Sequence, residues 1–166
     1  MNKNILIIVL IVAGLFGLML WGKSIQKPDS HVHAENPGEK SALASAETLY
    51  DFGAISMKSG KVNKIFIVNN PTDKDIVVRE VTTSCMCTNA YIEKGDSEIG
   101  PFGMVGMSYV PPANETIKAG GSMDLKVVYD PNAHGPSGVG SIDRLVYVSD
   151  NDGGTLQFEI KAVVTP

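Results

Sequence analysis

Short runs of alternating apolar and polar residues fill the sequence after Tyr50, and this period of two constrains the fold more than any other feature. The run "SMDLKVVYD" at 122–130 is a clear case, because successive side chains of a strand point to opposite faces. The apolar positions expected to share one face of this strand are Met123, Leu125, Val127 and Tyr129. Turn residues separate the runs at intervals typical of antiparallel sheets.

We predict about seven strands. Their runs lie at 49–55, 61–70, 76–83, 90–93, 122–130, 142–150 and 155–164, and the fourth either continues or restarts the third. The stretch "NDGG" at 151–154 predicts a hairpin turn between the last two runs. With 17 glycines, 9 prolines and no amphipathic helix of useful length, the predicted fold class is an all-β, immunoglobulin-like antiparallel β-sandwich.

The N-terminal stretch predicts a membrane helix. Residues 5–21, "ILIIVLIVAGLFGLMLW", carry no charged side chain, and as a helix they would span about 25 Å, close to the hydrocarbon thickness of a bilayer. We favour an uncleaved signal anchor over residues 1–22, with a cleaved signal peptide or a buried core helix as alternatives. The C-terminal part is then expected outside the cytoplasm, in the periplasm or beyond the cell, on a single-pass anchor in the cytoplasmic membrane.

Residues 23–47 are predicted to form a flexible stalk, because Ser, Pro, Ala and charged residues dominate them. His31 and His33 lie there two residues apart. They could hold a metal ion loosely or belong to a solvated spacer. Residues 48–166 are the predicted folded domain.

The net charge and the absence of certain motifs disfavour several function classes. The formal net charge of −4 predicts no basic patch and no nucleic-acid partner. Neither a catalytic triad order nor a phosphate loop occurs, so no enzymatic activity is expected. Residues 150–152 before Gly153 echo a calcium loop but suit a hairpin turn equally. Arg144 is expected to form a salt bridge with Asp130 or Asp143.

Both cysteines of the chain occur in "TTSCMCT", as Cys85 and Cys87. At the end of an extended strand their side chains would share one face, and their α-carbons would lie roughly 6.5–7 Å apart. That distance is at the outer limit for a relaxed disulfide. A disulfide would therefore need local distortion and would be easily reduced. A packing role, metal binding and reversible oxidation all remain open.

The metal hypothesis rests on soft ligands in nearby loops. Two thiolates on one face suit Cu(I), which accepts two or three sulfur ligands. Met104 and Met107 in "FGMVGM" and His134 in "NAHG" could complete the set with Cys85 and Cys87. Methionine also fills cores, so a cluster of these atoms within about 5 Å of one point is the condition for the metal site.

The sequence also resembles a protein family. The segments "YDFGAI" at 50–55, "KIFIVNNPTDKDIVVREVTTSCMCT" at 64–88, "DLKVVYDP" at 124–131 and "LQFEIKAVV" at 156–164 together resemble the bacterial DUF1573 family over about 48–164. The resemblance implies an immunoglobulin-type sandwich related to ASH and MSP-like domains, usually exported, and it implies no particular activity.

These observations predict a membrane-tethered, extracytoplasmic binding or scaffolding module without catalytic activity, whose partner is a protein. The alternative is a Cu(I)-binding or thiol-redox protein that uses the Cys-Met-Cys stretch. No cofactor is expected apart from Cu(I) in that alternative.

Overall fold

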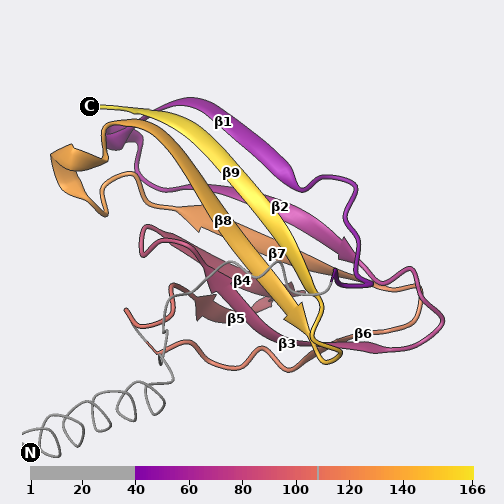
Figure 1. Cartoon of the computed structure of the whole chain (residues 1–166). Helices are drawn as coiled ribbons and strands as arrows, with labels where there is room; N and C mark the ends of the chain where they lie inside the picture. Colours follow the sequence, from indigo (N-terminus) through magenta and orange to yellow (C-terminus); the bar gives the residue numbers. More distant parts are fainter. Residues whose placement is uncertain (1–39, 108) are drawn as a thin grey trace, which may run out of the picture. The chain divides into compact units, whose positions relative to one another are not determined.

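The computed structural model describes residues 40–107 and 109–166, which form a sandwich of two β-sheets (Figure 1). The described strands are β1 (Leu49–Ser56), β2 (Val62–Asn69), β3 (Ile76–Thr83), β4 (Thr88–Lys94), β5 (Ser97–Phe102), β6 (Glu115–Ile117), β7 (Ser122–Tyr129), β8 (Gly140–Asp150) and β9 (Thr155–Thr165). Two short 3-10 helices, η1 (Met57–Ser59) and η2 (Gly135–Gly138), lie in the connections. One sheet has the order β1-β9-β8-β3-β6 and the other the order β2-β7-β4-β5.

Each of the seven predicted runs contains a strand, and the all-β sandwich is confirmed. Two strands were not predicted. β5 contains the dipeptide Gly100-Pro101, which reads as a turn, and it lies at a sheet edge where proline is tolerated. β6 has three residues and pairs only with β3, so its sequence carries almost no periodic signal.

The expectation of a purely antiparallel sandwich is wrong for one pair of strands. β1 runs parallel to β9, with Leu49 opposite Glu159 and Ser56 opposite Thr165. After β1 the chain passes through η1 into β2, which belongs to the other sheet. β1 therefore has no hairpin partner in its own sheet and pairs with the last strand of the chain.

The core lies between the two sheets and follows the alternation of the strands. The four apolar positions predicted for β7 are all buried, and the most exposed of them, Met123, has 6% of its surface accessible. Phe66 and Phe158 come from opposite sheets, and their ring centroids lie 4.8 Å apart. The predicted face of β7 is confirmed.

The folded part begins earlier than residue 48, where the stalk was expected to end. Leu43 is 2% exposed within the core, and the buried Ser41 hydroxyl donates a hydrogen bond to the Asp150 carboxylate. Ala44 and Asn69 exchange two backbone hydrogen bonds. Leu43 was overlooked because a single apolar residue in a polar stretch gives no periodicity.

Two connections meet at one end of the sandwich (Figure 1). The four residues Ser84–Cys87 carry the chain from β3 in one sheet to β4 in the other, and residues 130–139 carry it from β7 to β8. Within residues 40–107 and 109–166 no helix is long and apolar enough to cross a bilayer. The helix predicted for residues 1–22 lies outside this range, as do His31 and His33.

Candidate functional site

The two cysteines lie in a tight turn between β3 and β4. The backbone N–H of Thr88 donates to the carbonyl oxygen of Cys85 at 3.1 Å, which closes the turn. The α-carbons of Cys85 and Cys87 are 5.3 Å apart, and their sulfurs form a disulfide. The predicted extended geometry is wrong because the chain has to change sheets here, and the turn brings the α-carbons to a distance common in disulfides.

Hydrogen bonds from neighbouring elements fix this turn. The buried Thr83 hydroxyl lies 3.0 Å from the carbonyl oxygens of both Cys85 and Thr88. Ser84 donates its N–H to Leu145 of β8 and accepts from the N–H of Leu145, both at 2.9 Å. On the other side, the N–H of Asp130 donates to the carbonyl of Cys87 at 2.9 Å. The backbone of the turn is therefore held by β8 and by the end of β7.

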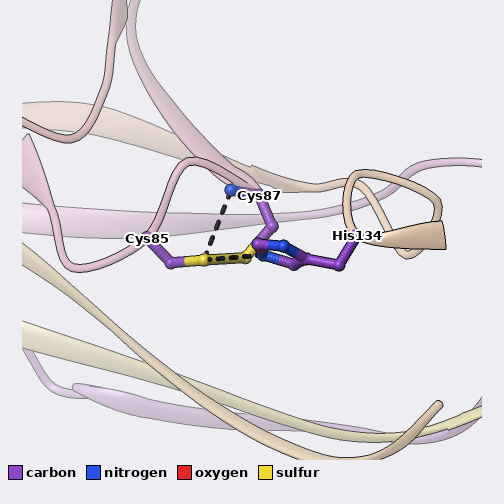
Figure 2. A group of neighbouring side chains, drawn as sticks. All are labelled: Cys85, Cys87 and His134. Carbon is purple, nitrogen blue, oxygen red and sulfur yellow. Dashed lines mark hydrogen bonds between the residues drawn. A yellow bond between two sulfur atoms is a disulfide. The ribbon is translucent and has the colours of Figure 1, made fainter. Parts of the chain in front are cut away.

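His134 brings an imidazole to the disulfide from the loop between β7 and η2 (Figure 2). Its Nε2 atom lies 3.2 Å from the sulfur of Cys85. The ligand atoms of Cys85, Cys87 and His134 all lie within 4.8 Å of one another. The loop that carries the ring is shaped by turn hydrogen bonds, including one from the Ser137 hydroxyl to the His134 carbonyl at 2.7 Å.

Arg144 reaches the second sulfur from β8. Its Nε atom donates to the sulfur of Cys87 at 3.2 Å, and its Nη1 donates to the Asp143 carbonyl at 2.7 Å. The expected salt bridge with a carboxylate is absent from the described part of the chain, where Asp130 pairs with Lys61 and Asp143 with Lys161. Arg144 is a member of this site that the sequence motifs do not predict.

Strand parity was the signal that could have found it. Ile142, Val146 and Val148 of β8 are buried in the core, and Arg144 has the same parity along the strand. An inward-facing arginine between apolar neighbours needs a hydrogen-bond acceptor inside the sandwich. At this end of the core the acceptor is a sulfur.

The two sulfurs have different environments. Cys87 is 1% exposed and belongs to the core, whereas Cys85 is only partly buried against it. The neighbouring Tyr129 is also buried, and its pKa lies above the ordinary value because burial disfavours the phenolate. The positive charge of Arg144 acts on this pKa in the opposite sense, and the negative charge of Asp130 adds to the rise.

The structure brings together three of the five predicted metal ligands, namely Cys85, Cys87 and His134. Met104 is partly buried and Met107 is 57% exposed, both in the loop after β5. Neither methionine contributes to the sulfur contacts described above. Residues 150–152, which resemble part of a calcium loop, form the hairpin turn, since the Asp150 carboxylate accepts hydrogen bonds from the backbone N–H groups of Asp152 and Gly154.

Comparison with known families places this turn in a recognised domain. Residues 43–114 match the model of the family described as protein of unknown function, DUF1573. The resemblance to DUF1573 is confirmed over that range. The matched range 43–114 contains both cysteines, whereas His134 and Arg144 come from later elements. No curated protein matches the chain significantly.

Solved structures support the fold. A protein of unknown function from Porphyromonas gingivalis W83 is similar with a TM-score of 0.55 and 18% identity, over 80% of this chain and 51% of that one. The chain thus spans about half the length of that protein. The ASH / PapD-like domain 7 of human CEP192 is similar with a TM-score of 0.47 and 12% identity, over 82% of this chain and 96% of that one. A C. elegans MSP family member, WR4, is similar with a TM-score of 0.42 and 12% identity, over 75% of this chain and 99% of that one. The similarity to the Porphyromonas gingivalis protein supports the two-sheet all-β sandwich.

Proposed function

We propose that this protein is a membrane-tethered, extracytoplasmic thiol–disulfide module, in which Cys85 and Cys87 exchange with thiols of a protein partner. One observation carries the proposal: each sulfur of the pair faces a polar side chain from a different element. His134 lies 3.2 Å from Cys85, and Arg144 donates to Cys87 at 3.2 Å. Imidazole and guanidinium groups next to cysteine sulfur favour the thiolate, which is the reactive form in exchange.

The proposal gives the expected protein partner a chemical identity, since it has to present thiols. It departs from the expectation of a module without catalytic activity, because repeated exchange is oxidoreductase chemistry. Nucleic acid has no part in it. The tether rests on the apolar run at 5–21, and an extracytoplasmic location is where disulfides persist.

The test uses the full-length protein in detergent. The oxidised protein is mixed with a reduced, unfolded protein that carries two thiols, and alkylation followed by mass spectrometry counts the free thiols on both chains. We expect two thiols to appear at Cys85 and Cys87 as the partner loses two. The Cys85→Ser, Cys87→Ser double variant should leave the partner reduced. A parent protein that behaves like this variant contradicts the proposal.

The tether is tested separately in membranes. An anchored protein stays in the membrane pellet after an alkaline carbonate wash and is released only by detergent. Protease added to intact cells after removal of the outer barrier should degrade the sandwich if it lies outside the cytoplasm. A protein found in the wash, or protected from protease, contradicts the anchored, extracytoplasmic placement.

Cu(I) binding by the reduced site is the second candidate, because the ligand atoms of Cys85, Cys87 and His134 lie within 4.8 Å of one another. The positive charge of Arg144 stands against it, since its Nε occupies a lone pair of the Cys87 sulfur and repels a cation. Titration of the reduced protein with Cu(I) against a competing chelator decides between them. Equal binding by the parent and the double Ser variant excludes this candidate.

A further inference from the structure

The two ends of the disulfide differ in access. Cys87 is 1% exposed and packs in the core, whereas Cys85 is partly exposed in the turn. An attacking thiolate approaches a disulfide along the line of its two sulfurs. Since Cys85 is the more exposed of the two residues, a second protein chain meets its sulfur first, and the sulfur that leaves is then Cys87.

Arg144 faces that leaving sulfur without a salt bridge of its own. Its side chain has the inward parity of β8, and among the residues described no carboxylate forms a salt bridge with it, although the charge of the neighbouring Asp143 carboxylate acts on it. A disulfide sulfur is neutral and accepts a hydrogen bond weakly. A thiolate at Cys87 would be a charge-assisted acceptor for the guanidinium. Arg144 therefore has its full counterion only when the disulfide is open.

We propose that Cys85 is the sulfur attacked by a partner protein's thiol, and that Arg144 is a positioning residue that holds the departing Cys87 thiolate. This inference rests on the proposed function. The reduced state gains a contact that the disulfide state lacks. Stabilising the reduced state makes a disulfide a stronger oxidant. The substrate class is therefore a protein dithiol, which this site converts to a disulfide.

The exchange balances in two steps. The first partner thiolate attacks the Cys85 sulfur, a mixed disulfide forms between them, and the Cys85–Cys87 bond breaks with its electron pair left on Cys87. The partner's second thiolate then attacks the partner's first sulfur, which is bonded to Cys85 in the mixed disulfide. This closes the partner's disulfide and releases Cys85 as a thiolate. Two electrons pass to the site. One of the partner's two thiol protons ends on Cys85 and the other enters the solvent.

His134 stands beside the sulfur that is released last. Its Nε2 is 3.2 Å from the Cys85 sulfur and exposed with its loop. The ring can donate a hydrogen bond to the Cys85 thiolate as the partner leaves, from the side opposite to the core. The two polar groups thus act on different sulfurs and at different steps.

The first experiment measures the equilibrium between the oxidised and reduced full-length protein in glutathione buffers of graded composition. In Arg144→Met we expect the equilibrium constant for reduction to fall by roughly tenfold, the lower range for a hydrogen bond to a charged group. Arg144→Lys keeps the charge and should recover most of the parent's value. Arg79→Met, at an exposed site on β3, is the matched control and should equal the parent.

The second experiment asks which sulfur the partner meets. The variants Cys87→Ala and Cys85→Ala each keep one cysteine, and each is mixed with oxidised glutathione and with an unfolded protein carrying an activated disulfide. We expect the mixed disulfide to form at least about tenfold faster on the chain that keeps Cys85, because the other thiol is buried. Circular dichroism confirms that each variant is folded.

The outcomes separate the two proposals. If the parent disulfide never exchanges, the proposed function fails. If the parent exchanges but Arg144→Met has the parent's equilibrium constant, or the chain that keeps Cys87 reacts as fast as the other, the proposed function stands and this inference is overturned.

Discussion

Reduction of the Cys85–Cys87 disulfide should leave the sandwich folded. The two cysteines are separated by only two positions in sequence. For a closed loop of about three residues, the chain-entropy relation gives about 1.6 kcal/mol of stabilisation at 25 °C, against about 3 kcal/mol for a loop of fifteen. A domain of this size should then lose roughly 4–8 °C in Tm on reduction. An ion pair between Arg144 and the Cys87 thiolate would make the loss smaller still.

Urea unfolding of the full-length protein in detergent, followed by far-UV circular dichroism with and without reductant, measures this difference. The Cys85→Ala, Cys87→Ala variant is the control, and its unfolding should not respond to the reductant. A loss of more than about 3 kcal/mol in the free energy of unfolding would refute the reasoning, because it exceeds the entropic stabilisation expected for so small a ring. It would mean that the disulfide holds the two sheets together and that exchange at this site is incompatible with a folded domain.

Three further predictions concern the packing of the sandwich. Leu43→Ala should lower the free energy of unfolding by about 2–4 kcal/mol in urea, because Leu43 is 2% exposed, whereas Leu49→Ala, at 46% exposed, should cost under about 0.5 kcal/mol; equal losses would remove residues 41–44 from the core. Asn70→Ala should cost about 2–3 kcal/mol, since its buried amide donates to three backbone carbonyls, and a loss below 0.5 kcal/mol would contradict this. The folded-state pKa of Tyr129 is raised above 10.0 by burial, so its contribution to stability is present below about pH 10 and is lost as the pH rises through the folded pKa. Stability of Tyr129→Phe should therefore decline less steeply above about pH 10 than that of the parent or of Tyr109→Phe, and parallel declines would refute the assignment.

Much of the fold could be read from alternation alone. The run at 76–83 coincides with β3, and the inward face of β7 was predicted residue by residue, because apolar residues at every second position leave little choice of register. The parallel pairing of β1 with β9 could not be read. It joins the first and last of the described strands, and no local pattern encodes which distant strand becomes a neighbour.

The candidate site was predicted in its residue types and not in its geometry. His134 was included as a soft ligand, but its contact with Cys85 spans 49 positions and depends on where two loops close. The cysteines were placed on an extended strand, because the sequence "VTTSCMCT" continues a β-branched run with no glycine or proline to mark a turn. The change of sheets after Thr83 overrode that local preference.

The way the turn is held is compatible with the proposed exchange at Cys85 and Cys87 in a stable sandwich. The Thr83 hydroxyl, the Ser84 hydrogen bonds to β8 and the Asp130 N–H fix the backbone of residues 84–88, and none of these bonds involves a sulfur atom. Opening the disulfide therefore removes none of these anchors, although the Cys87 N–H also donates to the Cys85 sulfur at 3.4 Å. The two thiols remain close after reduction, so ring closure carries a small entropic cost. In the proposed exchange, the partly buried Arg144 would gain a counterion when the disulfide opens, which would offset that closure. The balance between these two effects would set how strongly the site oxidises a partner.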